Sequence, residues 1–322
     1  MTTQRHSEIL IDLKKKLKEA VARHEAEGIL FSGGLDSSIL ASLSPQASLF
    51  TVSLGSYGED SEYAHLTATH LGRRHYIAKV EIQEAFEAIT QVIRILKTFD
   101  PAIPNDLATY FALQLAKEKG ASLVMTGDGA DELFCGYSYM FDLDLKSYLP
   151  RLAKRMRFNS VSLGKTLGIK IKQPFLDEKF VEFALGIEPA LKVVKEERKT
   201  WGKWILRKAF EGELPHQILW QEKRPIELGS GFSSLRKIIE AKISDEEFQK
   251  KQRQYSIKFL NREHLYYYEI YRKVVGEMPS PQGEELECPF CGVGMDKQAL
   301  HCRICGRTKE NLSLYRPGGL VG

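Results

Sequence analysis

A run of glycine and hydroxyl residues near the start of the chain has the composition of a phosphate-binding loop. It follows a short apolar segment, residues 28–31, that is typical of a buried strand, and it precedes a segment of helical composition. Backbone N–H groups and the positive end of a helix dipole would converge there, and glycines let a backbone approach an anion closely. The residues expected to contact nucleotide phosphates are Ser32, Gly33, Gly34, Leu35, Asp36, Ser37 and Ser38.

Three acidic residues, Asp128, Asp131 and Glu132, follow a second apolar segment at 122–125. The carboxyl ends of neighbouring parallel strands lie at one edge of a sheet, where ligands bind. We therefore expect Asp36 and Asp131 to lie close together and to hold Mg²⁺, which prefers a few carboxylates together with phosphate oxygens. The alternative is a helix whose first turn is simply enriched in acids.

The commonest nucleotide-binding loop has the pattern G-x-x-x-x-G-K-[ST], and one segment of the sequence matches it in part. Gly164-Lys165-Thr166 matches its end, but Asn159 stands where the first glycine belongs. We interpret this triplet as a coincidence.

Four of the five cysteines form two C-x₂-C pairs near the C-terminus, and a glycine follows each pair. Two such pairs can place four thiolates tetrahedrally around one ion, so the pattern predicts structural Zn²⁺ at Cys288, Cys291, Cys302 and Cys305. An iron centre with the same ligands is the alternative. His301 is expected to be a bystander, because four cysteines already complete the coordination shell. Such a zinc ribbon could bind RNA, bind a partner protein or stabilise a homodimer.

Strand and helix patterns alternate up to about residue 140. We expect strands at 28–31, 48–54, 75–80 and 122–125 and helices at 7–26, 61–71, about 81–97 and 106–119. Such alternation predicts an α/β fold with a parallel, twisted sheet flanked by helices. The segment that follows, to about residue 277, shows mainly helical patterns and forms a helical second half.

Composition shifts suggest where the domains end. Residues 1–277 would form one ATP-binding domain, with a leading helix at 1–26, a nucleotide-binding core at 27–140 and a helical part at 141–277. The Pro- and Gly-containing residues 278–284 have the composition of a linker. Residues 285–322 would form the zinc ribbon.

The overall composition is that of an ordinary globular protein. The chain has 322 residues, 43% of them hydrophobic, and a formal net charge of +4. That charge is compatible with RNA binding but does not indicate it, because dedicated nucleic-acid binders are more basic. No apolar run is long enough to span a membrane, and the polar N-terminus lacks a signal-peptide core. We therefore expect a cytoplasmic location.

The glycine-rich loop and the acidic segment together resemble those of enzymes that split ATP between its α and β phosphates. The sequence is similar to the synthetase domain of asparagine synthetase and to its relative β-lactam synthetase. The matching strings occur in the family's order within about residues 25–276: SGGLDSS at 32–38, DPAIPN at 100–105, TGDGADELF at 126–134, PFLD at 174–177, GKWILR at 202–207, QEK at 221–223 and YEIY at 268–271. The resemblance implies an adenine nucleotide α-hydrolase-like fold.

The resemblance also implies a two-step, ATP-dependent ligase. A carboxylate attacks the α-phosphorus of ATP, pyrophosphate leaves, and ammonia or an amine then displaces AMP from the acyl-adenylate to give an amide. By position in the motifs, Val52 and Gly127 would contact adenosine through their backbones, and Lys223 would reach the α-phosphate. Asp128 takes the place of a family Glu or Tyr that contacts the acid substrate or prepares the amine. Without the resemblance, Lys223 would be interpreted as an exposed loop lysine.

Two departures from the family concern the substrates. Asparagine synthetase carries an N-terminal glutaminase domain whose second residue is cysteine, whereas this sequence has Thr2 and one helix before its first strand. We therefore expect it to use free ammonia, another amine or a partner's product. Where the family has an Asp-Arg pair and a glutamate near the acid pocket, this chain has Val161-Ser162 and Lys170, which favours an acid other than aspartate.

A third departure concerns Cys135, which replaces a glycine common in the family. One interpretation is a small buried residue, and the other is a thiol close to the adenylate that could transfer sulfur.

Three functions follow from these patterns. The first is an AMP-forming amide ligase acting on a small acid. The alternative is an enzyme that adenylates tRNA or a carrier held by the zinc ribbon and then delivers nitrogen or sulfur. The third is a non-catalytic nucleotide-binding regulator, and the combination of Asp36, Asp131 and Lys223 argues against it.

Overall fold

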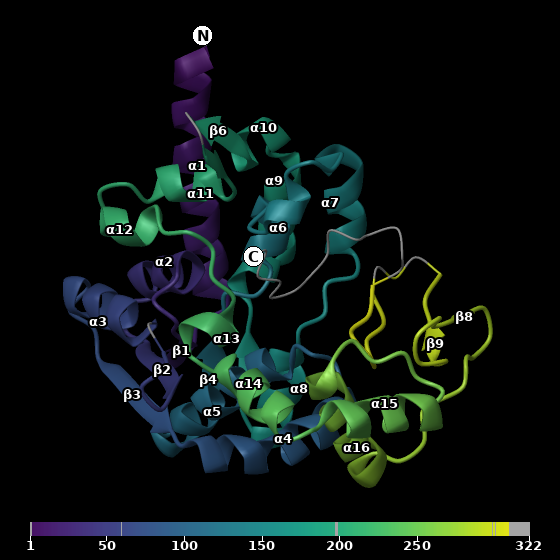
Figure 1. Cartoon of the computed structure of the whole chain (residues 1–322). Helices are drawn as coiled ribbons and strands as arrows, with labels where there is room; N and C mark the ends of the chain where they lie inside the picture. The colour runs from purple at the N-terminus through teal and green to yellow at the C-terminus, as the bar shows by residue number, and fades with distance from the viewer. Residues whose placement is uncertain (1, 59, 197–198, 298, 300, 309–322) are drawn as a thin grey trace. The chain divides into compact units, whose positions relative to one another are not determined.

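The computed structural model of the protein describes residues 2–58, 60–196, 199–297, 299 and 301–308 (Figure 1). The chain divides into two compact units. The first comprises Met1–Val52, Glu59–Ala78 and Phe111–Arg224, and the second comprises Ser53–Gly58, Lys79–Tyr110 and Pro225–Gly322. The end of the expected zinc ribbon, residues 309–322, lies outside the described residues.

A five-stranded sheet organises the first unit. Its strands, in the spatial order β3-β2-β1-β4-β5, are β3 (His75–Val80), β2 (Ser48–Leu54), β1 (Gly28–Leu30), β4 (Leu123–Met125) and β5 (Lys170–Lys172). Strand β1 pairs in parallel with both β2 and β4, and β4 pairs in parallel with β5. Strands β2 and β3 lie on one side of β1, whereas β4 and β5 lie on its other side, so the strand order reverses between β1 and β4. Open α/β sheets bind ligands at such a reversal. The parallel sheet confirms the expected fold class.

Strand β5 was not expected. It is three residues long and carries one apolar residue, Ile171, between two lysines, so its sequence lacks the apolar run of the central strands. It joins the sheet by pairing with β4, with Ile171 opposite Val124.

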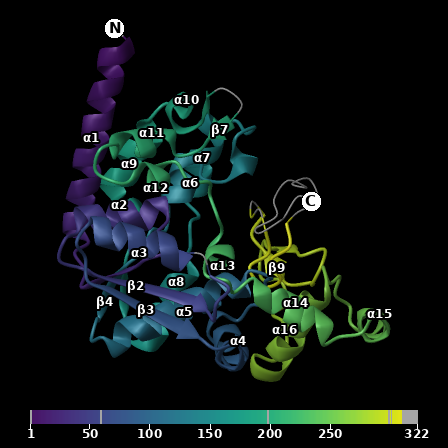
Figure 2. The ribbon, with the colours of Figure 1, turned by 60° about the vertical axis from the view of Figure 1, so that its left-hand side comes forward.

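Helices cover the sheet of the first unit. They are α1 (Thr2–Arg23), α2 (Leu35–Leu43), α3 (Asp60–His70), α6 (Ala130–Phe134), α7 (Leu145–Ala153), α8 (Asn159–Leu167), α9 (Glu178–Gly186), α10 (Pro189–Lys192), α11 (Trp204–Ala209) and α12 (His216–Leu219). Two short 3₁₀ helices and a hairpin complete the unit: η1 (Ser138–Met140), η2 (Pro174–Leu176), and β6 (Val194–Glu196) paired with β7 (Lys199–Trp201). Helix α2 packs on β1, and α8 packs on β5. Helix α1 packs on α9 and α11 (Figures 1 and 2). No helix in the described part of the chain is both long enough and apolar enough to cross a membrane.

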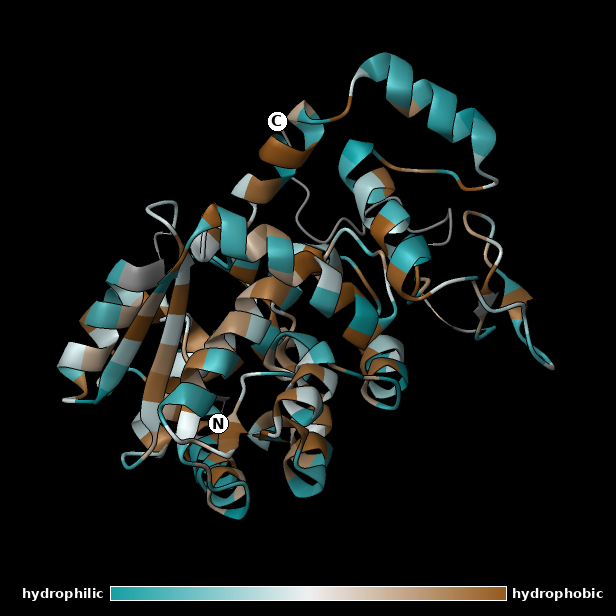
Figure 3. Ribbon diagram, turned by 90° about the horizontal axis from the view of Figure 1, so that it is seen from below, coloured by the Kyte–Doolittle hydropathy of each residue, from teal (hydrophilic) through white to brown (hydrophobic). Residues whose placement is uncertain are grey.

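The core of the first unit lies between the sheet and these helices. Leu13 and Leu17 project from one face of α1, one turn apart, and meet Ile29 of β1, Leu40 of α2 and Leu49 of β2 in a single cluster with no exposed surface. Hydrophobic colouring accordingly follows the strands and one side of the helices (Figure 3). Each such leucine or isoleucine contributes about 1.5–3 kcal/mol through burial, so this core can hold the strand ends rigidly.

The second unit is mainly helical. Its elements are α4 (Ile82–Leu96), α13 (Ile226–Gly229), α14 (Ser234–Ala241), α15 (Asp245–Gln254), α16 (Arg262–Val274) and the hairpin of β8 (Leu286–Glu287) and β9 (Gly294–Met295). Helix α5 (Ile103–Glu118) begins in this unit and ends in the first. Helix α16 packs on α4 and α14, and its His264, Tyr268 and Tyr271 surround Phe99 with ring centroids 5.1, 5.1 and 5.4 Å away. The aromatic residues of α16 therefore serve packing.

Candidate active site and cysteine cluster

The loop between β1 and α2 turns tightly around its glycines. Gly33 has a φ of +70°, and a Cβ there would clash with the backbone nitrogen of Ala64, so only glycine fits. Within the loop, Ser32 Oγ accepts a hydrogen bond from the Gly34 N–H at 3.2 Å, and Ser37 Oγ donates to the Gly34 carbonyl at 3.2 Å. These bonds fix the predicted phosphate loop at the N-terminus of α2.

The structure brings Asp36 and Asp131 together around the ammonium of Lys203. Lys203 Nζ lies 2.6 Å from Asp36 Oδ2 and 2.7 Å from Asp131 Oδ1. Asp36 is in the first turn of α2 after β1, and Asp131 is in the first turn of α6 after β4, so the paired strands β1 and β4 place the two acids side by side. The Lys203 side chain is 4% exposed, which leaves little solvent to screen the ion pairs.

Lys223 adds a second positive charge to this cluster. Its Nζ lies 2.7 Å from Asp131 Oδ2 and 5.6 Å from the ring centre of Tyr137. Burial alone would raise the pKa of Asp131, but the charges of Lys203 and Lys223 outweigh it and hold that pKa below its ordinary value. Burial likewise opposes the charge of Lys223, and Asp131 raises its pKa above the ordinary value of a lysine. Asp131 is therefore ionised between two ammonium groups.

Two glycines allow the backbone around this cluster to approach closely. A Cβ at Gly136 would clash with Asp131 Oδ1, and a Cβ at Gly202 would clash with the carbonyl oxygen of Cys135. Lys203 follows with a φ of +55°, and its N–H donates to the Phe134 carbonyl at 2.8 Å. The chain thus turns at residues 202–203 next to α6, and the Lys203 side chain reaches Asp131 of that helix.

Asp128 is held by three hydrogen bonds to a single oxygen. Its Oδ2 accepts from Thr126 Oγ1 at 2.7 Å, from Ser160 Oγ at 2.6 Å and from Gln173 Nε2 at 2.9 Å. The other oxygen, Oδ1, takes no part in these three bonds. The carboxylate therefore has a fixed orientation, with one oxygen committed to the protein.

The residues expected at adenosine lie in the same unit. A Cβ on Gly127 would lie 3.0 Å from Asp36 Cβ, so the turn after β4 runs directly against the start of α2. Val52 is buried in β2, the strand next to β1.

The carboxylate cluster fits a divalent cation. Asp36 Oδ1 and Ser38 Oγ are buried and have no hydrogen-bond partner among the described residues. A buried carboxylate oxygen without a partner is costly, and such oxygens are the ligands that Mg²⁺ prefers. Asp36 and Asp131 are the residues of this cluster with the donor chemistry that such an ion requires.

Glu132 lies next to the cluster and has an unusual pKa. Burial, reinforced by the negative charge of Asp131, raises the pKa of Glu132 to about 7. The hydroxyl of Tyr137 donates to Glu132 Oε1 at 3.4 Å. The charge of the Glu132 carboxyl therefore changes near neutral pH.

The buried environment of Cys135 favours the simpler of the two interpretations of that residue. Its side chain has no exposed surface, and burial raises the pKa of its thiol to about 11. The thiolate is the reactive form, so a thiol of this kind is a poor nucleophile near neutral pH. The residue has a φ of +59°, which suits the glycine more common in the resembling family.

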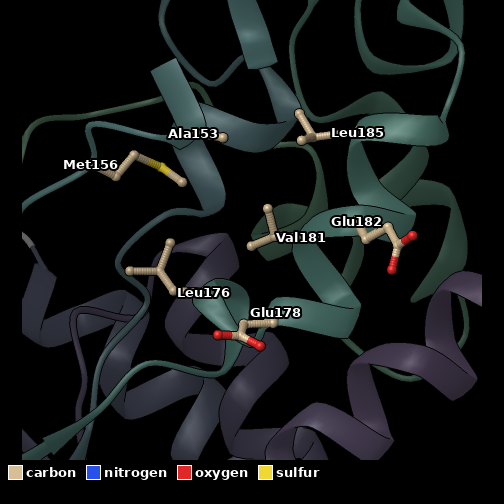
Figure 4. A pocket seen from close by; sticks show the side chains of 7 residues that line it. All are labelled: Ala153, Met156, Leu176, Glu178, Val181, Glu182 and Leu185. Carbon is tan, nitrogen blue, oxygen red and sulfur yellow. The ribbon is translucent and has the colours of Figure 1, made fainter. Parts of the chain in front are cut away.

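A cavity of about 470 Å³ lies in the first unit, away from the predicted site residues. It is lined by Ala153, Met156, Leu176, Glu178, Val181, Glu182 and Leu185 (Figure 4). Its wall is thus apolar apart from two glutamates. Leu176 connects it to the site, because this side chain packs closely on Gly129, the residue after Asp128.

The four predicted metal ligands form one compact cluster. Cys288 Sγ lies 3.8 Å from Cys305 Sγ, Cys291 Sγ lies 3.7 Å from Cys302 Sγ, and all four sulfur atoms lie within 4.8 Å of one another. Ligands about 2.3 Å from a tetrahedral metal lie about 3.8 Å apart, so the spacing fits a metal site. All four cysteines are buried, and His301 is not part of the cluster.

Hydrogen bonds join both cysteine turns to the rest of the second unit. The Ile304 carbonyl, between Cys302 and Cys305, accepts from the Phe99 N–H at 2.8 Å and from Thr98 Oγ1 at 3.0 Å. The Phe290 carbonyl, in the other cysteine turn, accepts from the Lys258 N–H at 2.9 Å. The cysteine cluster is therefore hydrogen-bonded to Thr98 and Phe99, directly before the DPAIPN string at 100–105.

The family of the chain follows from its match to known sequences. A family model described as asparagine synthase matches residues 12–166 and 140–284. The chain belongs to the asparagine synthase family. This confirms the resemblance that the motifs indicate.

Relatives within the asparagine synthase family are similar to much of this chain. A probable glutamine-hydrolyzing asparagine synthetase from Dictyostelium discoideum is 30% identical over 287 residues, which cover 76% of this chain and 51% of that protein. The glutamine-hydrolyzing asparagine synthetase B of Escherichia coli (strain K12) is 28% identical over 310 residues, covering 85% of this chain and 55% of that protein. The chain spans about half the length of these curated relatives.

Solved structures show a weaker likeness. The U34-tRNA thiolase NcsA from Methanococcus maripaludis, with its [4Fe-4S] cluster, matches with a TM-score of 0.37 and 15% identity, over 96% of this chain and 90% of that one. A TM-score this low supports no conclusion about function.

Some residues at the candidate site were not singled out from the sequence. Lys203 lies within the matched string GKWILR, which was the signal available for it. Ser160 and Gln173, the partners of Asp128, gave no such signal, because neither residue type is distinctive on its own.

Proposed function

We propose that this chain is an ATP-dependent ligase that forms AMP and pyrophosphate while joining a carboxylic acid to ammonia or an amine. The observation that carries the proposal is the cluster of two acids and two lysines, Asp36, Asp131, Lys203 and Lys223, at the end of a glycine-rich phosphate loop. Membership of the asparagine synthase family supports this reaction class. A site of this kind acts by neutralising charge and aligning the reacting groups.

In the first step, a carboxylate oxygen of the acid attacks the α-phosphorus of ATP. The bond between the α-phosphorus and the bridging oxygen breaks, and pyrophosphate leaves with the bonding electrons. Residues 32–38 would bind the leaving phosphates through backbone N–H groups, and Lys223 would stabilise negative charge on the α-phosphate. Val52 and Gly127 would contact adenosine.

Asp36 and Asp131 would hold Mg²⁺ in this step. When bound, the ion supplies positive charge that offsets the charge of the phosphates. The unpartnered Asp36 Oδ1 supports this assignment.

In the second step, the amine nitrogen attacks the carbonyl carbon of the acyl-adenylate. The bond from that carbon to the AMP oxygen breaks, AMP leaves, and the nitrogen loses a proton. We assign Asp128 the role of positioning the amine and accepting the proton, because its Oδ2 is fixed by three donors while Oδ1 is not used by them.

We further propose that the acid is not aspartate. The Asp-Arg pair that the resemblance leads one to expect is replaced by Val161-Ser162, and Lys170 reverses the charge of a glutamate. The cavity beyond Leu176 is lined by five apolar side chains and by Glu178 and Glu182, whose negative charges would disfavour an acid with a second carboxylate.

For the cysteine cluster we propose structural Zn²⁺. The chemistry of four thiolates in two C-x₂-C turns supports this choice over harder metals. The same cluster is the observation in favour of the second function, in which the substrate is RNA or a carrier bound near these cysteines. The buried, protonated thiol of Cys135 argues against sulfur transfer through that residue.

Pyrophosphate release from ATP, screened over carboxylic acids and amines with and without cellular RNA, tests this proposal. We expect release to require an acid, with aspartate a weaker substrate than the best acid. Asp131→Asn should lower release at least 100-fold, whereas Lys165→Met, at an exposed lysine of α8, should leave it unchanged. Release that depends on RNA would favour the second function, and aspartate as the best acid would refute the substrate assignment.

A further inference from the structure

The guanidinium of Arg207 is buried among backbone carbonyl groups from two separate segments. Its Nε donates to the Gly202 carbonyl at 3.0 Å, and its Nη1 donates to the Gln221 carbonyl at 3.1 Å and to the Leu219 carbonyl. The residue is 5% exposed. These three bonds use the fork-like geometry of a guanidinium, which a lysine ammonium cannot reproduce.

Two tryptophans hold the guanidinium in this position. Its central carbon lies 5.1 Å from the ring centre of Trp201 and 5.9 Å from that of Trp220, and the two rings lie 5.2 Å apart at 78°. Trp201 directly precedes Gly202, and Trp220 lies between Leu219 and Gln221, so each tryptophan is next in sequence to a residue whose carbonyl Arg207 binds. The rings and these carbonyls therefore form one rigid unit.

Both bonded segments lead directly to a lysine of the candidate site. Gly202 precedes Lys203, and Gln221 lies two residues before Lys223. The Gln221 side chain also donates from Nε2 to the Gly33 carbonyl at 3.1 Å, so the same segment contacts the phosphate loop. Lys203 itself has a left-handed backbone conformation, which needs support from its surroundings.

We propose that Arg207 is a positioning residue that sets the locations of both site lysines relative to the phosphate loop. The inference rests on the proposed function, in which the two lysines meet the phosphates of ATP. The three side-chain bonds of Arg207 all go to backbone carbonyls, so it acts through the lysines. Its loss would displace two positive charges at once.

Arg73 provides a matched control in the same unit. Its guanidinium also donates to three backbone carbonyls, those of Ala41, Ser44 and Ala47. These lie at the C-terminal end of α2 and in the turn before β2, away from the lysines. A merely structural role for Arg207 would therefore make Arg207→Lys and Arg73→Lys behave alike.

The test compares Arg207→Lys, Arg73→Lys and the unaltered full chain. Calorimetry measures the affinity for pyrophosphate with Mg²⁺ and for adenosine, thermal unfolding measures Tm, and ATP–pyrophosphate exchange measures kcat and KM. We expect Arg207→Lys to weaken pyrophosphate binding about 10-fold and to lower the exchange kcat about 100-fold, with adenosine affinity within twofold. Arg73→Lys should lower Tm while leaving pyrophosphate affinity and kcat within twofold.

Equal effects of the two substitutions on pyrophosphate affinity would overturn the inference, as would unchanged pyrophosphate affinity in Arg207→Lys. If Arg207→Lys does not fold, Trp201→Leu removes one aromatic face from the guanidinium and should weaken pyrophosphate binding about threefold; unchanged affinity would again overturn it. If the unaltered chain binds pyrophosphate but shows no exchange with any acid, the proposed function fails while the binding comparison still decides the role of Arg207.

Discussion

The ammonium of Lys203 lies 2.7 Å from Asp131 Oδ1, inside the first unit. It also lies 2.6 Å from Asp36 Oδ2, so one buried positive charge joins two acids that follow different strands of the sheet. Without that charge, two carboxylates would repel each other where little water can screen them. Any cation drawn to these acids must share them with Lys203 or displace it.

Replacing Lys203 with methionine should make folding depend on divalent cations. We expect Lys203→Met to lower the free energy of unfolding by roughly 3 kcal/mol without Mg²⁺, because the substitution leaves uncompensated buried charge. Added Mg²⁺ should restore part of the loss by replacing the missing positive charge. Urea unfolding with and without Mg²⁺ measures both effects, and Lys165→Met is the exposed control. Equal stability of Lys203→Met and the unaltered chain without Mg²⁺ would contradict this role.

Mg²⁺ affinity should rise with pH through neutrality. The pKa of Glu132 is raised to about 7, so this carboxyl is neutral below that pH and negative above it. Each lost proton adds negative charge beside Asp131 and attracts the cation more strongly. Calorimetric titration with Mg²⁺ between pH 6 and pH 8 should show the increase in the unaltered chain and a flatter profile in Glu132→Gln. The same pH dependence in both proteins would assign the effect to another group.

Acid should weaken the first unit between about pH 4 and pH 2. Arg23 binds both oxygens of Asp177, at 2.9 and 2.7 Å, and these hydrogen bonds lower the pKa of Asp177 to about 2. An acid with a lowered folded-state pKa contributes stability above its unfolded pKa, near 4, and the contribution disappears as pH falls through the folded pKa. Because Arg23 is 37% exposed, solvent screening limits the effect to about 1 kcal/mol. The free energy of unfolding of Asp177→Asn, measured against pH, should lack this decrease between pH 4 and pH 2. The same decrease in that variant as in the unaltered chain would refute the assignment.

Metal loss should loosen the segment before the DPAIPN string. The Phe99 N–H bonds to the Ile304 carbonyl inside a cysteine turn, and the metal that we propose for this cluster would hold the thiolates of that turn together. Cys302→Ser should lower bound metal and speed hydrogen exchange at Phe99, while exchange in α2 stays unchanged. Cys135→Ser, at the cysteine outside the cluster, is the matched control and should keep full metal content. Protection of Phe99 that survives metal removal would show that the cluster does not restrain this segment.

Local sequence patterns were enough to predict the elements that end at the site. The apolar segments 48–54 and 75–80 coincide with β2 and β3, and the glycine-rich loop falls between a strand and a helix as expected. The pairing of β1 with β4, which places Asp36 beside Asp131, is read from the fold rather than from these patterns. Strand β5 was not predicted, because two of its three residues are lysines and it therefore lacks an apolar run.

The residues that connect distant parts of the chain could not be predicted from local patterns. Lys203 stands 167 residues from Asp36, and no periodicity relates them. Two of the three donors to Asp128, Ser160 and Gln173, and the bond between Phe99 and Ile304 are likewise long-range contacts, which depend on the completed fold. The raised pKa of Glu132 requires its burial to be known.

The central claim is that the α-phosphorus of ATP is attacked by a carboxylate. The most direct measurement uses the acid selected by pyrophosphate release, labelled with ¹⁸O in its carboxyl group, and follows the products by mass spectrometry and ³¹P NMR. The account predicts AMP and pyrophosphate, with one ¹⁸O atom carried into each AMP. Formation of ADP and orthophosphate, or of AMP without the label, would contradict it.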